Sequence, residues 1–124
     1  METKFLGLRT VGYKVSDLNA AKEWYSKVLG IAPYFDQPFY VGFNIAGYEL
    51  GLQPDESTDG PKGNNTVTYW GVDNVHEIYS ELLDEGATPH AEPMDVGEGI
   101  IVASVIDPWG NDFGIIYNPL FELP

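Results

Sequence analysis

An internal repeat constrains the fold more than any other feature of the sequence. Residues 39–54 (FYVGFNIAGYELGLQP) align without a gap with residues 102–117 at an offset of 63, which places Phe43 on Ile106, Gly47 on Gly110 and Gly51 on Gly114. A second match relates residues 30–33 (GIAP) to residues 86–89 (GATP) at an offset of 56. Because 124 residues are too few for two independent cores, the two copies are expected to form one domain.

The first copy has signals for a strand, a helix and a hairpin. Alternation over residues 8–15 predicts a strand that is buried on its Val11, Tyr13 and Val15 side. Ser16 and Asp17 offer a helix cap, and helical spacing of apolar residues continues to Gly30. Residues 39–45 and 48–53 then predict a hairpin about a two-residue turn, with a possible short strand near residues 34–35.

The second copy follows a polar, Gly/Pro/Asn-rich stretch. Residues 55–65 are predicted to be a linker between module one, residues 5–54, and module two, residues 66–119. Residues 66–72 alternate like a strand, and Asn74 with Glu77 resembles a capping box before a helix that ends at Gly86. The two apolar runs around residues 107–111 (DPWGN) predict a second hairpin.

Composition and charge exclude several classes of function. With 44% hydrophobic residues and no apolar run near the length of a membrane span, the chain is expected to be a soluble globular protein. Six basic against nineteen acidic residues, a net charge of −13, disfavour nucleic-acid and membrane partners. The absence of cysteine and of a secretory pattern at the start favours a cytoplasmic location.

With both copies in view, the chain resembles the vicinal oxygen chelate superfamily of glyoxalases, bleomycin-resistance proteins and extradiol dioxygenases. The matching motifs are residues 15–18 (VSDL), 24–30 (WYSKVLG), 47–50 (GYEL), 86–87 (GA) and 107–111 (DPWGN). The resemblance implies an α+β fold in which two tandem βαβββ modules form a curled, mostly antiparallel sheet around a central cavity, with the helices outside. It also implies a homodimer, since exposed sheet edges need covering.

The family usually places a metal ligand on the first and last strand of each module. By the neighbouring motifs, those positions are Thr10, Gly51, Val67 and Gly114. Glycine and valine side chains have no donor atoms, and a lone threonine hydroxyl is a weak ligand, so the prediction is that the site holds no metal and no cofactor. A shift of two residues along the same face would make Glu49 or Asp112 a candidate metal ligand. The two histidines, His76 and His90, are interpreted as surface residues and not as ligands.

Strand alternation predicts which side chains face the cavity. Val41, Phe43 and Leu50 are expected to pack under the helices. The residues that alternate with them are expected to point the other way, toward the cavity. In module two, Ile101, Ala103 and Val105 are assigned to the same face as Asp112 and Gly114. The predicted ligand-binding residues are Thr10, Tyr40, Asn44, Glu49, Gly51, Gln53, Val67, Tyr69, Ala103, Val105, Asp112 and Gly114.

Glycine recurs on this predicted face, at positions 12, 42, 51, 71 and 114. Because glycine weakens a strand, these positions indicate that something needs the room. Two interpretations stay open at this point: a ligand that lies close to the backbone, or relief of crowding in a strongly curved sheet.

Three functions are consistent with these patterns. The first is a bleomycin-resistance-like protein that binds a small aromatic or cationic molecule in a metal-free cavity. The second is an isomerase, lyase or dioxygenase, either metal-dependent with displaced ligands or metal-free with Glu49 as the general base, the only catalytic candidate. The third is an interaction subunit with a vestigial cavity. The sequence leaves open whether the protein is an enzyme.

Overall fold

The computed structural model describes residues 3–4, 8–55 and 67–121. The chain divides into two compact units, Met1–Ser57 (unit one) and Thr58–Pro124 (unit two). Unit one contains β1 (Thr10–Val15), α1 (Leu18–Leu29), β2 (Phe35–Gln37), β3 (Tyr40–Ile45) and β4 (Tyr48–Pro54). Unit two contains β5 (Tyr69–Gly71), α2 (Val75–Asp84), β6 (Thr88–Asp95), β7 (Ile101–Ile106) and β8 (Asp112–Tyr117).

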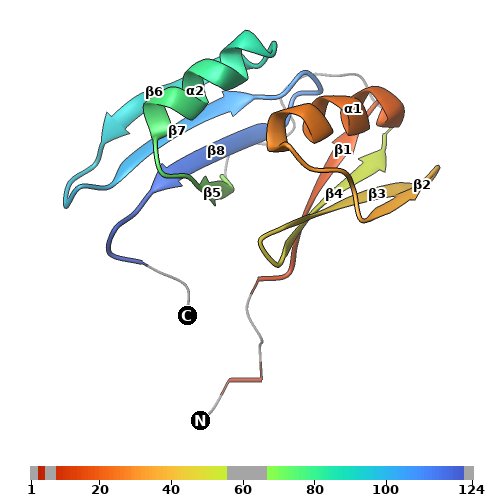
Figure 1. The fold of residues 1–124 in the computed structure, drawn as a ribbon, viewed down its shortest axis with the longest axis horizontal. Coiled ribbons are helices and arrows are strands. Elements are labelled where there is room, and N and C mark those ends of the chain that lie inside the picture. Colours follow the sequence, from red (N-terminus) through yellow and green to blue (C-terminus); the bar gives the residue numbers. More distant parts are fainter. Residues whose placement is uncertain (1–2, 5–7, 56–66, 122–124) are drawn as a thin grey trace. The chain divides into compact units, whose positions relative to one another are not determined.

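Both units have the element order βαβββ, which confirms the predicted α+β fold with tandem modules (Figure 1). The predicted linker lies outside the described residues except for Asp55, and the module boundaries, the single shared domain and the central cavity stay predictions.

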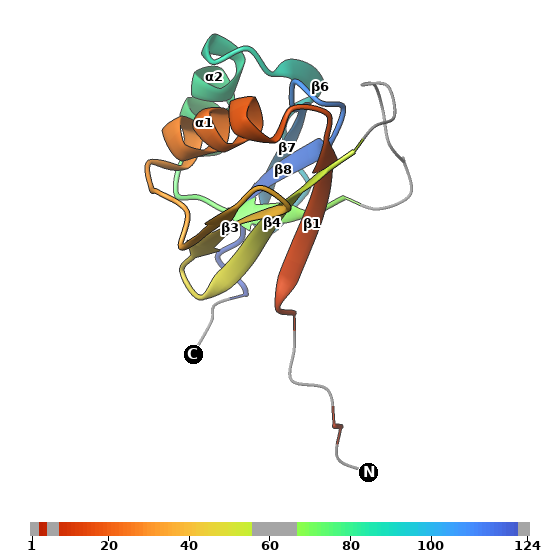
Figure 2. The same ribbon diagram turned by 90° about the vertical axis from the view of Figure 1, so that its right-hand side faces the viewer.

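Each unit forms one four-stranded mixed sheet. The strand orders are β1-β4-β3-β2 and β5-β8-β7-β6, with the first pair parallel and the other two pairs antiparallel in each sheet. In Figures 1 and 2, each helix lies on one face of the sheet in its own unit. Among the described residues of each unit, no helix lies on the other face of its sheet.

The helices begin and end where their caps predict. Asp17 accepts a hydrogen bond from the Ala20 amide at the start of α1, and Gly30 ends the helix in the left-handed conformation, at φ 73°. Asn74 accepts from the Glu77 amide at the start of α2. The Asp17 and Asn74 side chains satisfy backbone amides that the helices cannot pair internally, so a short polar residue fixes the start of each helix. No helix among the described residues is long and apolar enough to cross a membrane.

The hairpin of unit one matches the predicted register and faces. Ile45 pairs with Tyr48 across the two-residue turn, and Ala46 and Gly47 both have positive φ, at 53° and 94°. This turn twists in the sense that strands prefer. Val41, Phe43, Leu50 and Leu52 are fully buried on the face that α1 covers.

The hairpin of unit two has its turn at the predicted residues, but its strands do not pair as the gap-free repeat implies. Ile106 pairs with Asp112, so the loop has five residues, 107–111, and not the two of unit one. The Asp107 carboxylate orders this loop by accepting from the backbone amides of Trp109 and Asn111. The longer loop moves β7 by one residue relative to the offset of 63, and a one-residue move exchanges the two faces of a strand.

The predicted face of β7 is therefore wrong. Ala103 pairs with Ile115 and Val105 with Phe113, and all four side chains are buried in the core beside α2. Ile101 belongs to the same face. The residues of β7 that share a face with Asp112 and Gly114 are instead Val102, Ser104 and Ile106.

Strand β6 was not predicted from the residues, although the βαβββ resemblance implies one. It is the edge strand of its sheet and contains Pro89 and Pro93. Proline lacks the amide that a central strand needs, and sheets tolerate it at edges. Two register irregularities interrupt the β6–β7 pairing, the first between Pro89 and Ala91, so His90 lies in a bulge.

Candidate functional site

A carboxylate surrounded by hydroxyl groups lies on the face of unit one opposite α1. Thr10 Oγ1 donates a hydrogen bond to Glu49 Oε1 at 2.8 Å, and Tyr34 OH donates to Glu49 Oε2. Tyr40 donates a third hydrogen bond to the same carboxylate. We call Thr10, Tyr34, Tyr40 and Glu49 the Glu49 cluster.

Three strands, and the residue that precedes a fourth, position these side chains. Thr10 on β1 is the parallel neighbour of Glu49 on β4, so both side chains leave the sheet side by side. Tyr34 immediately precedes β2, where its amide donates to the Gly42 carbonyl at 2.9 Å. Tyr40 opens β3. The cluster therefore depends on the register of the whole sheet and not on one loop.

Two glycines make room for the cluster itself. A Cβ atom at Gly42 would lie 2.7 Å from Glu49 Oε2 and 2.9 Å from the Tyr34 ring, and one at Gly51 would collide with the Tyr40 hydroxyl. In unit two, a Cβ at Gly114 would lie 2.7 Å from the Tyr69 ring. The space above these three glycines is thus filled by other atoms of the same unit, which neither sequence-based interpretation anticipated. Gly12 and Gly71 face open space.

The hydrogen bonds hold Glu49 in its charged form. Partial burial acts to raise the pKa of Glu49, but the bonds from Tyr34, Thr10 and Tyr40 together outweigh it and the pKa is lowered. Burial, followed by the hydrogen bond to Glu49, raises the pKa of Tyr40 to about 12. The hydrogen bond to Glu49 is also the main cause of the raised pKa of Tyr34. The cluster is therefore one anionic carboxylate with neutral hydroxyl donors at neutral pH.

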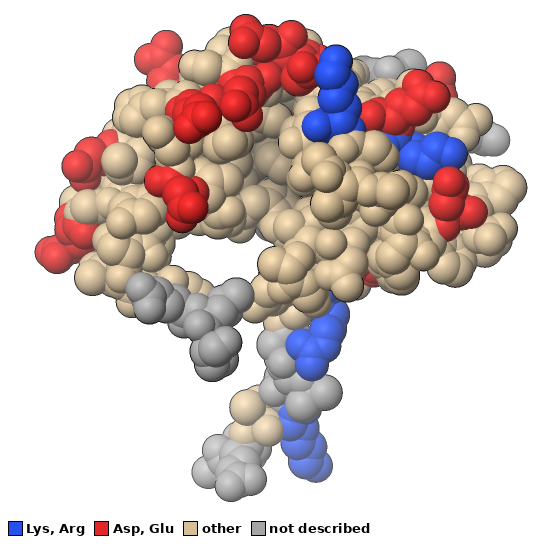
Figure 3. All heavy atoms as spheres, in the orientation of Figure 1, with Lys and Arg blue, Asp and Glu red and all other residues tan. Residues whose placement is uncertain are grey.

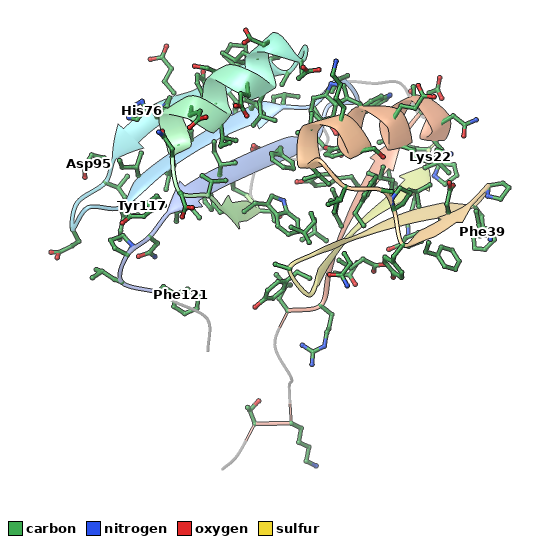
Figure 4. All side chains as sticks on the ribbon, in the orientation of Figure 1. Lys22, Phe39, His76, Asp95, Tyr117 and Phe121 are labelled. Carbon is green, nitrogen blue, oxygen red and sulfur yellow. The ribbon has the colours of Figure 1, made fainter. Side chains whose placement is uncertain are left out.

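Further aromatic rings lie beside the two tyrosines of the cluster. The Phe35 ring lies 6.4 Å from the Tyr34 ring, 6.0 Å from the Tyr40 ring and 6.1 Å from the Phe39 ring, measured between centroids. Tyr34 is 62% exposed and Phe39 66% exposed, and Figure 4 labels Phe39 in the short connection between β2 and β3. The Glu49 cluster thus combines negative charge with accessible aromatic surface.

Two predicted site residues of unit one stand outside the cluster. Asn44 is the cross-strand neighbour of Glu49, but its Oδ1 accepts from the Gly47 amide at 2.8 Å and so shapes the hairpin turn. Gln53 is exposed and pairs with Lys14 in the β1–β4 register, four residues along the strand from Glu49.

A second polar group lies on the corresponding face of unit two. His90 Nδ1 is 3.1 Å from Ser104 Oγ and 3.4 Å from Asp112 Oδ2. The Asp112 side chain is 9% exposed and Ser104 is 4% exposed, whereas the His90 side chain is 49% exposed. We call these three residues the His90 cluster.

The two clusters occupy equivalent strand positions. In unit one, Glu49 lies two residues before Gly51, which pairs with Gly42 on the neighbouring strand. In unit two, Asp112 lies two residues before Gly114, which pairs with Ser104. The edge strands pair there too, through Phe35 in unit one and Ala91 in unit two. Tyr34 and His90 are the residues just before these pairs, so each reaches the carboxylate of its own unit.

The His90 cluster has the residue types of a hydrolytic triad without its geometry. Such a triad needs the carboxylate on one ring nitrogen and the serine on the other, so that the imidazole can take the serine proton. Here Ser104 and Asp112 both contact Nδ1. With both contacts on Nδ1, the arrangement instead favours the tautomer that carries its proton on Nδ1, facing the carboxylate, and leaves an acceptor lone pair on Nε2.

The remaining predicted residues of unit two do not join this cluster. Val67 and Tyr69 are exposed, at 39% and 44%, and the Tyr69 ring lies over Gly114. Ala103 and Val105 are buried in the core on the other face of the sheet. His76 lies in the first turn of α2, as predicted, and is labelled there in Figure 4.

The four family metal positions do not fit a divalent metal. Thr10 donates its hydroxyl proton to Glu49, and Gly51, Val67 and Gly114 provide no donor atom. Among the residues that the structure describes, no group of three or more His, Cys, Asp or Glu side chains is placed to hold a metal ion. The metal-free interpretation stays a prediction.

Sequence reasoning missed Tyr34 and His90, although the repeat contains the signal for both. Each follows the proline of a Gly-x-x-Pro motif, so the offset of 56 that relates the motifs also relates Tyr34 to His90. The offset of 63 relates Glu49 to Asp112 in the same way. Using both offsets together would have paired each carboxylate with its partner.

Known structures share this fold. The chain is similar to a glyoxalase-related enzyme from Fulvimarina pelagi, with 19% identity over 97% of this chain and 94% of the other and a TM-score of 0.79. A lactoylglutathione lyase from Agrobacterium tumefaciens matches with 17% identity over 98% and 100% of the two chains and a TM-score of 0.74. A glyoxalase/bleomycin resistance protein/dioxygenase family enzyme from Burkholderia phytofirmans PsJN has 21% identity over 87% and 95%, with a TM-score of 0.73.

At these identities the likeness supports the fold and not a particular activity. No curated protein sequence matches the chain significantly. The family model for the Glyoxalase/Bleomycin resistance protein/Dioxygenase superfamily matches residues 7–115, which is most of the chain and includes both clusters. The chain therefore belongs to the Glyoxalase/Bleomycin resistance protein/Dioxygenase superfamily.

Proposed function

We propose that this protein binds a small organic cation at the Glu49 cluster, in the manner of a binding protein and not of a metal enzyme. One observation carries the proposal: the Glu49 carboxylate is held ionised by hydroxyl donors from Thr10, Tyr34 and Tyr40. Among the described residues, no lysine or arginine neutralises it. A charged group with neutral partners keeps its field available to a ligand of opposite sign.

The charge of the whole chain supports a cationic ligand. A net charge of −13 attracts cations over distances longer than a contact and repels anions. On the face drawn in Figure 3, acidic side chains (red) are common and basic ones (blue) few. The exposed aromatic rings beside Glu49 favour an organic cation over a metal ion, since aromatic faces attract alkylated cations.

The lowered pKa of Glu49 weighs against its predicted alternative role as a general base. A base is most effective when its pKa lies near the working pH, and an acid group shifted downward accepts protons poorly. The catalytic version of the Glu49 hypothesis is therefore the weaker one.

Thermal unfolding with a panel of organic cations tests the proposal. A ligand at about 100 times its dissociation constant adds about 2.7 kcal/mol to the free energy of unfolding, or several degrees in Tm for a domain of this size. We expect such a shift for the protein with Glu49 intact and its loss in Glu49→Gln. Glu23→Gln is the matched control, because Glu23 is exposed on α1, which covers the other face of the sheet.

Native mass spectrometry of the purified protein provides a second readout. A retained small molecule that is absent from Glu49→Gln supports the binding function. If no cation of the panel shifts Tm and no molecule is retained, the proposed function is wrong, and the interaction subunit with a vestigial cavity becomes the better hypothesis.

A second candidate function is proton-transfer catalysis within the same superfamily, and the His90 cluster is the observation that favours it. His90 presents Nε2 on a 49% exposed side chain, and Asp112 would stabilise the imidazolium that forms when Nε2 accepts a proton. Deuterium incorporation from heavy water into a small enolisable ketone such as dihydroxyacetone, lost in His90→Gln, would support this candidate. No incorporation above the buffer rate would remove it.

We also propose that the protein is a homodimer. Each sheet has two edge strands, β1 and β2 in unit one and β5 and β6 in unit two, and open edges are commonly covered in native proteins. Sedimentation at micromolar concentration should give twice the chain mass of 13.7 kDa. A monomer under these conditions would rule the dimer out.

A further inference from the structure

The hydrogen bonds that Glu49 already makes restrict what else it can bind. An ionised carboxylate offers about four lone-pair sites. Thr10 and Tyr34 occupy one site on each oxygen, and Tyr40 takes a third. About one lone-pair site is left for a ligand, although the full negative charge remains.

A cation with several N–H donors fits this site poorly. A primary ammonium carries three N–H donors and is strongly hydrated, so each donor that loses water needs a new acceptor. The hydroxyl protons of Tyr34 and Tyr40 point toward Glu49, which leaves only their neutral oxygens as further acceptors. Such a ligand would exchange good hydrogen bonds to water for fewer and weaker ones.

A fully alkylated cation has the opposite requirements. It has no N–H donors to satisfy, is weakly hydrated, and is attracted both by negative charge and by aromatic faces within about 6 Å. Tyr34 contacts the carboxylate directly, Phe35 lies beside Tyr34, and Phe39 lies beside Phe35. These three residues are 62%, 37% and 66% exposed. Charge and ring surface are thus both available to it.

We propose that the ligand of the Glu49 cluster is a quaternary ammonium compound or a similarly alkylated cation. This inference rests on the proposed function and specifies its ligand class. It follows from the occupied lone pairs of Glu49 together with the exposed aromatic surface beside it.

Calorimetric titration with three matched probes tests the inference. Choline and ethanolamine differ in the methylation of the nitrogen, and 3,3-dimethyl-1-butanol has the shape of choline without the charge. We expect choline to bind about tenfold more tightly than ethanolamine, which corresponds to one additional cation–π contact. The uncharged alcohol should not bind measurably, and Glu49→Gln should lose choline binding.

Two variants of Tyr34 separate the role of its ring from that of its hydroxyl. Tyr34→Phe keeps the ring and frees one lone pair of Glu49, so the preference for choline over ethanolamine should fall severalfold. Tyr34→Leu also removes the ring, so the affinity for choline itself should fall. Tyr48→Phe is the control, because Tyr48 belongs to the opposite face of the same sheet.

The possible failures are distinguishable. If ethanolamine binds as tightly as choline, with both losing affinity in Glu49→Gln, the ligand-class inference is overturned and the cation-binding function survives. If the alcohol binds as tightly as choline, or no probe binds to the folded protein, both proposals are wrong. Circular dichroism of every variant confirms that the comparison concerns folded protein.

Discussion

Units one and two share a scaffold but differ in the chemistry of equivalent positions. Both place a carboxylate on the same strand position. In unit one Tyr34, immediately before the edge strand, reaches Glu49, and in unit two His90, within the edge strand, reaches Asp112. In unit one neutral hydroxyl groups contact the carboxylate, and in unit two an imidazole does. The duplicated backbone fixes where the carboxylate lies, and single side chains decide what it can do.

The two units also differ in net charge. Unit one has seven acidic and five basic residues, whereas unit two has twelve acidic residues and one basic residue. The exposed carboxylate cluster with aromatic neighbours is thus in the less charged unit. A local arrangement of Glu49 and its rings, more than a general excess of acid, is therefore what the binding proposal depends on.

Glycine substitutions should give the largest effect on stability. Gly114→Ala would bring Cβ to 2.6 Å from the Thr68 carbonyl oxygen, a backbone atom that the Gly114 amide also contacts, so β5 must move. We expect a loss of about 1–3 kcal/mol in the free energy of unfolding, as for other overpacked sites. Chemical denaturation measures it.

The matched controls for Gly114→Ala are Gly12→Ala and Gly71→Ala, where the new Cβ meets nothing within 4 Å. Their free energy of unfolding should change by less than about 1 kcal/mol. Gly51→Ala should lie between, because the displaced atom is the end of the Tyr40 side chain. Equal losses in all four variants would contradict the interpretation that the glycines make room for particular neighbours.

The carboxylate of unit one should make stability pH-dependent. Because the pKa of Glu49 is lowered in the folded state, its contribution is fully present above the ordinary value of 4.5 and is lost as pH falls through the lower folded value. Glu49→Gln should therefore destabilise the protein by about 1 kcal/mol at neutral pH, the magnitude of a modest hydrogen-bond network. The difference should vanish in strong acid, and a difference independent of pH would contradict the ionised cluster.

The carboxylate of unit two should fix the tautomer of a histidine. Nitrogen NMR should show the neutral form of His90 with its proton on Nδ1, because the Asp112 carboxylate faces that nitrogen. Asp112→Asn should remove the preference. His76, in the first turn of α2, is the internal control and should be unchanged by the substitution. A His90 spectrum that Asp112→Asn leaves unaltered would sink this account of the cluster.

The smallest expected effect concerns Tyr40. Its pKa is raised to about 12, so the hydroxyl stabilises the fold below the ordinary value of 10.0 and this contribution is lost as pH rises toward 12. In an absorbance titration, Tyr40→Phe should remove one tyrosine that ionises near pH 12. Tyr48→Phe should leave this ionisation step unchanged. If Tyr48→Phe removed the step, its assignment to Tyr40 would be wrong.

Local signals in the sequence predicted much of this fold. Asp17, Asn74 and the Ala46-Gly47 turn each satisfy their own backbone, so neighbouring residues determined the helix starts and the first hairpin. The faces of β3 and β4 followed from that turn. The same reasoning failed for β7, because the residues of the second loop are held by Asp107 and a gap-free repeat hides a change of loop length.

The Glu49 and His90 clusters could not be fully predicted, because they depend on strand pairings that the sequence does not show. Tyr34 and His90 reach their carboxylates only because an edge strand, two strands away from β4 or β8, lies in register with the sheet. Strand β6 itself was hidden by its two prolines, which only an edge position tolerates. Tyr40 and Glu49 were found because alternation about the first turn places them on one face, and Thr10 because the family resemblance assigns it to that face.

Mapping the binding site of choline by NMR tests the central claim most directly. The claim is that equivalent carboxylates in the two units have different roles and that the one in unit one binds the cation. Addition of choline to the labelled protein should shift the signals of Thr10, Tyr34, Tyr40 and Glu49, and leave those of Ser104 and Asp112 in place. Shifts confined to the His90 cluster, or none in the Glu49 cluster at saturating choline, would contradict the account.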